Sequence, residues 1–384
     1  MTLPLPSDDA LAHSRRVGDH IAGRIAAAGG WLSFANYMAE VLHAPGLGYY
    51  AAGARKFGSA GDFVTAPEMT PLFARALAVQ VDEVLAASAP IMLEVGAGSG
   101  RLAADLLTAM GENGTLPERY LILDLSADLR ERQWRTLAAA VPDFLPRVAW
   151  IDRLPERFSG LVVGNELLDA FPVHVVTWRQ GAAWERGIVA AEGGLAWEER
   201  PATGRLAGRA QALAQEMGWE DGYQSEIGLA AEAWVAAWGE ILDAGSILLL
   251  DYGFPRREFY HPQRTGGTLM CHYRHHAHGD PLWLPGLQDI TAHVDFTAVA
   301  LAAHEAGLEI QGYATQGQFL LNCGILDQLA RLPADTPDYI RGAGAVNKLV
   351  LPHEMGELFK VIAFGRGSGE ALRGFAQGDR SGRL

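Results

Sequence analysis

Three polar residues that could take part in chemistry, Asn165, Glu166 and Asp169, follow the apolar run GLVVG at residues 160–164. That run has the length and composition of a buried strand, so the polar side chains stand where a strand opens into a loop. Burying a carboxylate costs several kcal/mol unless a partner balances its charge. We therefore predict that a bound ligand or substrate supplies the partner. If residues 166–169 form a helical turn, Glu166 and Asp169 share one face.

A glycine turn lies earlier in the chain. In LEVGAGSGRL, Gly96, Gly98 and Gly100 separate a short apolar segment from a helical pattern. Glycines permit a tight turn and let the backbone approach a ligand closely. A dinucleotide-binding G-x-G-x-x-G motif would need its last glycine at the next position, where Arg101 stands. The turn by itself also fits an ordinary connection between a strand and a helix.

Acidic residues accompany this turn. Glu94 precedes it, Asp124 lies near the end of the apolar segment 120–125, and Asp152 ends the segment 147–152. Open parallel sheets bind ligands beyond the carboxyl ends of their strands. Asp124 could accept from both hydroxyls of a ribose, and Asp152 could reach an adenine edge, although a solvated or capping role suits Asp152 equally. Acids in this arrangement favour S-adenosylmethionine over NAD, FAD or ATP.

Methyl transfer from S-adenosylmethionine would explain the polar residues after 160–164. Asn165, as a cofactor contact, and Glu166 would stand at the end of a fourth strand beside the first, where the reactive methyl points. Such a transfer requires the nucleophile's lone pair to be held in line with the methyl carbon. Paired carboxylates can fix a planar guanidinium and orient one nitrogen. The alternative interpretation is that Glu166 caps a helix and Asp169 forms a local ion pair.

Further candidates are spread along the chain. GDFVTAPE carries Asp62, Thr65 and Glu68 on a glycine-rich segment that could act as a lid over cofactor and substrate. Asp251 ends the apolar run SILLLD, and His293 in DITAHVDF could accept a proton near neutral pH. A hydrogen-bonded structural histidine is the alternative for His293. CHYRHHAH lacks a clean ligand spacing, so no metal site is predicted.

Apolar runs and helical patterns alternate through the middle of the chain, which is typical of an α/β protein with a parallel sheet covered on both faces. The expected strands are 91–96, 120–125, 147–152, 160–164 and 246–253, and the expected helices between the first three are 101–110 and 127–140. A helical pattern at 17–43 is interrupted by glycines 29 and 30.

The domain organisation expected from these patterns has three parts. Residues 1–75 form an N-terminal helical and glycine-rich lid segment, and residues 76–366 form the core. Insertions of the core at about 175–245 and 254–295 follow its fourth and fifth strands. The tail, 367–384, is rich in glycine, arginine and serine, and we expect it to be flexible.

Composition narrows the functional classes. The 384 residues are 49% hydrophobic and 20% charged, with a formal net charge of −14, which is typical of a globular protein without a nucleic-acid-binding face. Such a charge suits a cationic partner. Cys271 and Cys323 fit no disulfide or metal framework, and no secretory signal or membrane-length apolar run is present. We therefore expect a cytoplasmic protein without a membrane span.

Several motifs, in this order, resemble the MidA family of S-adenosylmethionine-dependent methyltransferases. They are LSFANYMAEVLHAPGLGYYA, KFGSAGDFVTAPEMTPLF, LEVGAGSGRLAADLL, NELLDAFPVH, LLLDYG, DITAHVDFTA and LPHEMGELFKVIAFG, and they span residues 30–366. The resemblance implies a class I, Rossmann-like methyltransferase fold with a mostly parallel seven-stranded sheet. It places Gly96, Gly98 and Gly100 in the family's cofactor loop. The chain departs from the family at Asp124, where glutamate is common, and at 30–32, where Gly-Trp-Leu replaces the usual Gly-Pro.

The resemblance also implies an acceptor, since the mitochondrial member of the family is a complex I assembly factor with protein-arginine methyltransferase activity. For this chain, as a bacterial relative of that member, we thus expect methylation of an arginine in a partner protein, which could be a respiratory complex I subunit. The cofactor would be S-adenosylmethionine and the product S-adenosylhomocysteine. Two alternatives stay open: a small-molecule N- or O-methyltransferase on the same core, and an assembly factor with little turnover. Exposed edges of the terminal strands could support a homodimer.

Overall fold

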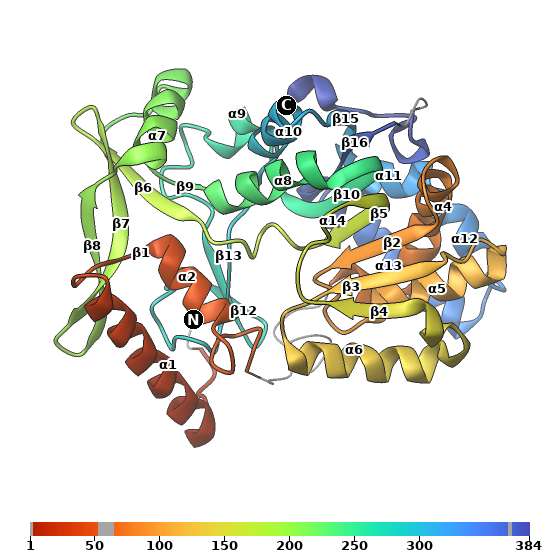
Figure 1. Ribbon diagram of the computed structural model, residues 1–384, viewed down its shortest axis with the longest axis horizontal. Coiled ribbons are helices and arrows are strands. Elements are labelled where there is room, and N and C mark those ends of the chain that lie inside the picture. The colour runs from red at the N-terminus through yellow and green to blue at the C-terminus, as the bar shows by residue number, and fades with distance from the viewer. Residues whose placement is uncertain (1–2, 53–64, 368–370) are drawn as a thin grey trace. The chain divides into compact units, whose positions relative to one another are not determined.

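The computed structural model describes residues 3–52, 65–367 and 371–384, and the chain divides into two compact units (Figure 1). The first unit is made of residues 1–63, 168–233 and 254–295. The second is made of residues 64–167, 234–253 and 296–384. Most of the predicted N-terminal segment, most of the first predicted insertion and all of the second therefore belong to one unit, whereas the predicted core makes up most of the other.

The second unit contains a sheet whose strand order is β15-β16-β10-β5-β2-β3-β4. The bounds are β2 Ile91–Val95, β3 Arg119–Leu123, β4 Val148–Ile151, β5 Phe158–Asn165, β10 Leu242–Phe254, β15 Glu309–Thr315 and β16 Phe359–Arg366. β10, β5, β2, β3 and β4 run parallel, and β16 is antiparallel to both β10 and β15. This arrangement confirms the predicted fold class and the predicted pairing of the fourth strand with the first.

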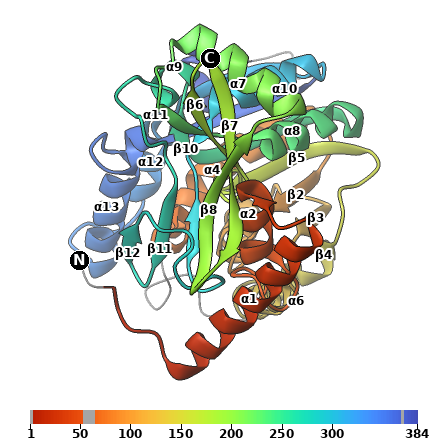
Figure 2. The ribbon, with the colours of Figure 1, turned by 90° about the vertical axis from the view of Figure 1, so that its left-hand side faces the viewer.

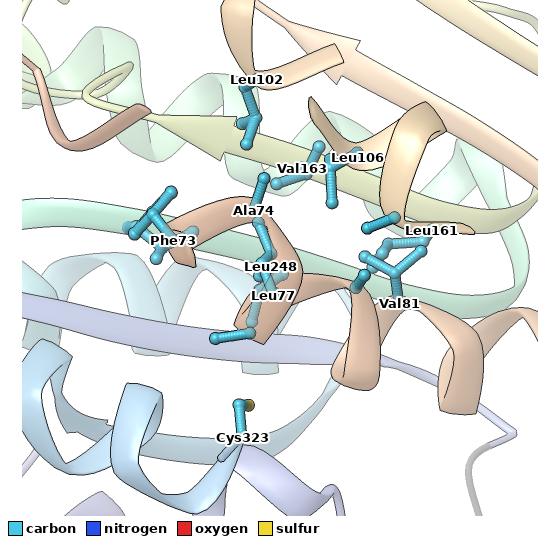
Figure 3. Packing of buried hydrophobic residues seen from close by; sticks show 14 of the residues in the cluster. Phe73, Ala74, Leu77, Val81, Leu102, Leu106, Leu161, Val163, Leu248 and Cys323 are labelled. Atoms are coloured by element: carbon cyan, nitrogen blue, oxygen red, sulfur yellow. The ribbon is translucent and has the colours of Figure 1, made fainter. Parts of the chain in front are cut away.

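Helices cover this sheet because their apolar faces match its buried strands. Their bounds are α3 Ala66–Met69, α4 Pro71–Ala87, α5 Arg101–Asn113, α6 Ala127–Ala140, α8 Leu229–Ile241, α10 Phe296–Glu305, α11 Gln316–Asn322, α12 Ile325–Ala330, α13 Pro337–Val350 and α14 Met355–Leu358, with a 3-10 helix η1 at Pro142–Arg147. Leu77 of α4, Leu106 of α5 and Val163 of β5 are fully buried in one cluster (Figure 3). Truncating such a leucine to alanine costs about 2–5 kcal/mol.

The C-terminal tail differs from the expectation. Leu372 and Phe375 are buried in the core cluster, and the Phe375 ring lies 5.3 Å from that of Phe319. The backbone N–H of Gly374 donates to Gln80 Oε1 at 2.8 Å. The predicted flexible tail is therefore wrong for residues 371–384, because two apolar anchors within a polar composition attach it to the second unit.

The first unit combines helices with two antiparallel sheets. Helix α1 spans Asp8–Ala27 and α2 spans Phe34–His43, which confirms the interruption at glycines 29 and 30. The larger sheet has the order β1-β7-β6-β9 with β8 paired to β7, and Figure 2 shows its long β7–β8 hairpin. Its strands are β1 Leu32–Ser33, β6 His174–Arg179, β7 Ala182–Ala191, β8 Gly194–Pro201 and β9 Gln224–Ile227.

The rest of the first unit consists of helix α7, in the first predicted insertion, and of short elements in the second predicted insertion. The smaller sheet has the order β12-β11-β13. The bounds are α7 Gly204–Met217, α9 Arg256–Phe259, β11 Met270–Tyr273, β12 His276–His278, β13 Asp289–Thr291 and β14 Val294–Asp295. Among the described residues, no helix is long and apolar enough to cross a membrane.

Candidate functional site

The glycine turn after β2 has the left-handed backbone that its glycines predict. Gly96, Gly98 and Gly100 adopt φ angles of 71°, 52° and 82°. A Cβ atom on Gly100 would lie 2.9 Å from the Cα of Gln133, so the turn also needs glycine for space. Helix α5 begins directly afterwards at Arg101, and its first N–H groups face the end of the turn. The turn is therefore a preformed backbone cradle.

A buried amide holds this cradle in place. Gln133, on α6, is fully buried, and its Nε2 donates to Gly98 O at 3.2 Å and to Asp124 Oδ2 at 2.7 Å. Its Oε1 accepts from Trp150 Nε1 at 2.9 Å. Gln133 thus joins the glycine turn to the ends of β3 and β4. Gln133 was not predicted from the sequence. A glutamine among the apolar positions of an amphipathic helix is the signal that could have indicated its role.

Replacement of Gln133 by Leu tests this arrangement. We expect about tenfold weaker S-adenosylmethionine binding and a loss of about 1–3 kcal/mol in the free energy of unfolding, because Asp124 and Trp150 each lose a buried partner. Thr136→Val is the matched control, since the Thr136 hydroxyl makes one bond to the same turn, to Ser99 O at 2.8 Å. Cofactor affinity that is equal in Gln133→Leu and the control would contradict the bracing role.

Asp124, predicted to bind ribose, is 8% exposed at the end of β3. Its Oδ1 accepts from Ser126 N at 2.9 Å, and Gln133 occupies part of Oδ2. Both carboxylate oxygens of Asp124 are thus held in place at the end of β3. The next residue, Leu125, is 79% exposed and offers an apolar surface that a base could cover. Asp152 lies exposed on a bend after β4.

Glu94, in β2, is 3% exposed and accepts a hydrogen bond from the Tyr120 hydroxyl at 2.6 Å. Burial raises the pKa of Glu94 from 4.5 to about 7, although the bond from Tyr120 acts in the opposite direction. The negative charge of Asp124 adds to the increase in pKa. Glu94 can therefore change charge near neutral pH beneath the glycine turn, where its ionisation would favour a cationic ligand.

The pKa of Glu94 has a consequence for stability. Because the folded protein holds this proton more tightly than the unfolded chain, the stabilisation is fully present below pH 4.5 and is lost as the pH rises through 7. The loss is on the order of 3 kcal/mol. We expect Glu94→Gln, which carries no charge, to flatten this part of the pH dependence in urea unfolding. The control variant Glu156→Gln, at an exposed position, should keep the wild-type pH dependence of the free energy of unfolding. The same pH dependence in the wild type and in Glu94→Gln would contradict the raised pKa of Glu94.

Asn165 and Glu166 lie where β5 ends, as predicted. Glu166 adopts a φ angle of 51°, a left-handed conformation that costs a non-glycine residue about 1–3 kcal/mol and is found mainly at functional sites. Its N–H donates to Leu250 O at 2.8 Å, and Asn165 Nδ2 donates to Glu166 Oε1 at 3.3 Å. Asn165 Oδ1 is buried without a hydrogen-bond partner among the residues that the structure describes. This atom is suited to a ligand donor.

The expected helical turn at 166–169 is wrong, since these residues form a bend and a turn instead. Asp251, which was predicted as a residue of the substrate or lid region, is 1% exposed and explains how the loop is held. Its Oδ2 accepts from Leu167 N at 3.0 Å, and its Oδ1 accepts from Tyr252 N at 3.0 Å. The carboxylate of Asp251 therefore fixes the backbone that follows Glu166.

The predicted lid residues have different positions. Glu68, in α3, accepts a short hydrogen bond from the Ser99 hydroxyl, which attaches α3 to the glycine turn. Thr65 is the N-cap residue of α3, and its side chain makes no capping bond. Asp62 lies outside the described residues. Of the two described residues, Glu68 is the one that contacts the glycine turn.

Two predicted catalytic residues, Asp169 and His293, belong to the first unit. Asp169 is 6% exposed, and its carbonyl accepts from Ala292 N at 3.0 Å. It also helps to raise the pKa of Tyr50, after burial and Asp289, to which the Tyr50 hydroxyl donates at 2.8 Å. The His293 ring stacks on the Phe254 ring, with 5.2 Å between the centroids. No group of three or more potential metal ligands occurs in the described part of the chain.

Comparison with known proteins shows the family to which the chain belongs. A family model described as an S-adenosyl-L-methionine-dependent methyltransferase matches residues 72–314. The chain belongs to this family. A solved structure from Burkholderia thailandensis, bound to S-adenosyl-homocysteine, is 49% identical over 100% of both chains, with a TM-score of 0.96. A native crystal structure of a protein from the same organism is 48% identical over 100% of both chains, with a TM-score of 0.93.

Curated relatives are more distant but cover most of the chain. The mitochondrial protein arginine methyltransferase NDUFAF7 of Danio rerio is 29% identical over 90% of this chain and 85% of its own length. The homologue of Caenorhabditis elegans is 27% identical over 79% of this chain and 75% of its own length. These similarities confirm the resemblance to the MidA family. The protein is an S-adenosylmethionine-dependent methyltransferase of class I.

The residues of the second unit fit this cofactor. The left-handed glycine turn leaves room for a ligand's close approach, Asp124 follows the end of β3, and Asn165 Oδ1 is a buried acceptor without a hydrogen-bond partner among the described residues. Acidic groups such as Glu94 and Glu166 suit a ligand that carries a sulfonium and an ammonium group. The donor set thus agrees with S-adenosylmethionine better than with a phosphate-bearing cofactor.

Proposed function

We propose that this methyltransferase acts on the guanidinium group of an arginine in a partner protein. The observation that supports the proposal most is Glu166, a carboxylate in a strained left-handed conformation at the end of β5. A planar guanidinium pairs with a carboxylate through two parallel hydrogen bonds, which orients the remaining nitrogen. Several relatives that are similar over most of the chain carry the name protein arginine methyltransferase.

The protein has to orient the acceptor and stabilise its charge during the methyl transfer. When bound, the cofactor supplies a methyl group on a positively charged sulfur, so the carbon is already activated. A bond forms between a guanidinium nitrogen and the methyl carbon, the sulfur–carbon bond breaks with its electron pair going to sulfur, and the nitrogen loses one proton. In our proposal Glu166 orients the guanidinium and keeps charge on the other nitrogens. Asn165 donates to Glu166 at 3.3 Å and holds its carboxylate.

The second unit would bind the cofactor through groups already described. The turn at Gly96, Gly98 and Gly100 would receive the amino-acid part, and Asp124 would accept from the ribose hydroxyls. Leu125, which is 79% exposed, would cover the adenine. Asp169 and His293, which belong to the first unit, stay predicted catalytic residues, His293 as a proton acceptor. A complex I subunit as the partner, a cytoplasmic location and a homodimer stay predictions.

A labelling experiment tests the nature of the acceptor. Purified protein is incubated with methyl-labelled S-adenosylmethionine and a bacterial lysate depleted of its own methylation activity, after which macromolecules are separated from small molecules. We expect label in one or a few protein bands, and none when Glu166→Gln replaces the wild type. Label that appears in the small-molecule fraction alone would contradict the proposal and favour a metabolite methyltransferase. Unlabelled fractions despite tight cofactor binding would favour an assembly factor.

A further inference from the structure

Helix α6 carries a second side chain, Arg130, that contacts the ends of β3 and β4. We infer that Arg130 is a positioning residue for the adenosine part of S-adenosylmethionine, through which the protein distinguishes adenine from other bases. The inference rests on the proposed function in one respect, because it takes from there the placement of the ribose at Asp124 and of the adenine at Leu125. These residues all lie in the second unit.

The Arg130 guanidinium joins two adjacent strand ends. Its Nε donates to Asp124 O at 2.6 Å, and its Nη2 donates to Ile151 O at 2.8 Å. β3 and β4 run parallel with Leu123 paired to Ile151, so one carbonyl follows β3 directly and the other ends β4 at the same edge of the sheet. Because both donors belong to one rigid planar group, the guanidinium sets the spacing of the two carbonyls.

Each held carbonyl also orients the residue that follows it. A peptide unit is planar, so a fixed Asp124 O orients the N–H of Leu125, and a fixed Ile151 O orients the N–H of Asp152. Leu125 is 79% exposed and would cover the adenine, and Asp152, exposed on a bend, would accept from the edge of the base. Arg130 therefore controls the spacing of the two residues that would contact the base.

Helix α6 holds Arg130 close to these strand ends. The helix begins after Ser126, whose Oγ accepts from Leu129 N at 3.3 Å and whose carbonyl accepts from Arg130 N at 3.0 Å. Gln133, three residues further along the same face, donates to Asp124 Oδ2 at 2.7 Å. Gln133 thus holds the side chain of Asp124, whereas Arg130 holds its carbonyl and links it to β4.

A purely structural tether would have a different effect from a positioning residue. Loss of a structural tether lowers the free energy of unfolding but leaves the relative affinities for two bases unchanged. Loss of a positioning residue changes the relative affinities, because a hydrogen-bonding site that has lost its spacing no longer rejects the wrong base. The preference for adenine is therefore the quantity to measure.

The test is binding of two ligands to Arg130→Met, which keeps an unbranched apolar side chain but removes every donor. S-adenosylhomocysteine is compared by calorimetry with S-inosylhomocysteine, whose base carries an oxygen in place of the amino group. We expect the wild type to prefer the adenosyl ligand by about tenfold or more. Arg130→Met should bind the adenosyl ligand about tenfold more weakly and the inosyl ligand less than about twofold more weakly. Arg130→Lys should behave similarly, since one ammonium group cannot replace the planar fork.

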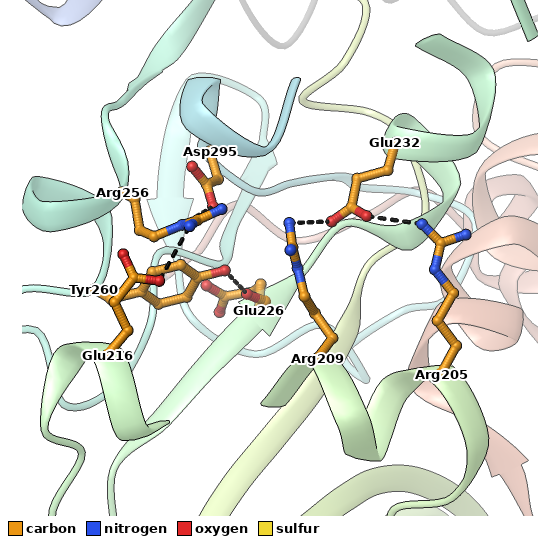
Figure 4. Close-up of polar contacts among 8 residues, drawn as sticks. All are labelled: Arg205, Arg209, Glu216, Glu226, Glu232, Arg256, Tyr260 and Asp295. Atoms are coloured by element: carbon orange, nitrogen blue, oxygen red, sulfur yellow. Dashed lines mark hydrogen bonds and ion pairs between the residues drawn. The ribbon is translucent and has the colours of Figure 1, made fainter. Parts of the chain in front are cut away.

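Two other arginine variants serve as controls. Arg135→Met changes an exposed arginine of the same helix, which pairs with Glu131. Arg209→Met, in the first unit, removes a partner of the buried Glu232 carboxylate, whose Oε1 lies 3.0 Å from Arg209 Nη2 (Figure 4). Arg209→Met should lower the free energy of unfolding, because a buried carboxylate loses one of its partners. Both controls should keep the wild-type preference for the adenosyl ligand.

Several results would overturn the inference. An unchanged preference in Arg130→Met would show a purely structural tether, and wild-type affinities in Arg130→Lys would show that charge matters and not the planar fork. An equal loss of preference in Arg209→Met would assign the effect to stability. A wild type that binds both ligands equally would remove adenine recognition itself. These measurements need no acceptor, so label found only on small molecules would contradict the proposed function and leave the role of Arg130 standing.

Discussion

Replacing Glu166 with Gln lowers kcat for methyl transfer by about a hundred- to a thousandfold, which is the usual cost of losing one group that stabilises developing charge. The amide keeps the size of the side chain but cannot accept both hydrogen bonds of a guanidinium. We expect the dissociation constant of S-adenosylmethionine, measured by calorimetry, to stay within about threefold of the wild-type value. The backbone conformation at residue 166 should stay unchanged in the variant. It is held by the hydrogen bond from the residue 166 N–H to Leu250 O, which involves no side-chain atom.

Glu156→Gln is the matched control, since Glu156 is exposed and precedes the other end of β5. It should leave kcat and cofactor affinity unchanged. A Glu166→Gln protein with wild-type kcat would contradict the role of the carboxylate in transfer. A protein that no longer binds S-adenosylmethionine would instead assign Glu166 to the cofactor contacts.

Replacing Gly100 with Ala weakens S-adenosylmethionine binding about 10- to 100-fold. The new Cβ meets Gln133 Cα at 2.9 Å, so the glycine turn or α6 must shift, and the φ angle of 82° adds strain. A 10- to 100-fold loss of affinity corresponds to a loss of about 1.4–2.8 kcal/mol in binding free energy. Equilibrium binding of the labelled cofactor measures the effect without any acceptor.

Gly114→Ala is the control that separates the strain of a left-handed backbone from a displacement of the glycine turn. Gly114 ends the same helix, α5, with a φ angle of 75°, and a Cβ there meets nothing within 4 Å. Both variants should lose about 1 kcal/mol of stability from the left-handed backbone, but only Gly100→Ala should lose cofactor affinity. Equal affinities in the two variants would show that the turn does not cradle the cofactor.

The sheet and the glycine turn could be predicted because both depend on local sequence. Apolar runs mark buried parallel strands, and glycines at 96, 98 and 100 mark a turn that only left-handed backbone can make. The loop after β5 could not be predicted, because Glu166 adopts a φ angle that its residue type disfavours. The N–H groups of Glu166 and Leu167 donate to Leu250 O and to the Asp251 carboxylate, which are far away in sequence, and these bonds impose the conformation.

Gln133 was not predicted for a related reason. It acts through partners 9 to 35 residues away in the sequence. Its one local signal is a polar residue among the apolar positions of its helix. The grouping of the N-terminal segment with both insertions into one unit also depends on contacts between distant segments.

Identification of the methylated atom tests the central claim most directly. Protein labelled by the purified enzyme and methyl-labelled S-adenosylmethionine is digested, and the modified peptide is sequenced by mass spectrometry, with a total acid hydrolysate analysed for methylated amino acids. The account predicts methylarginine at a defined position, absent from the Glu166→Gln reaction. Label on lysine, on a carboxylate or on a small molecule, with arginine unmodified, would contradict it.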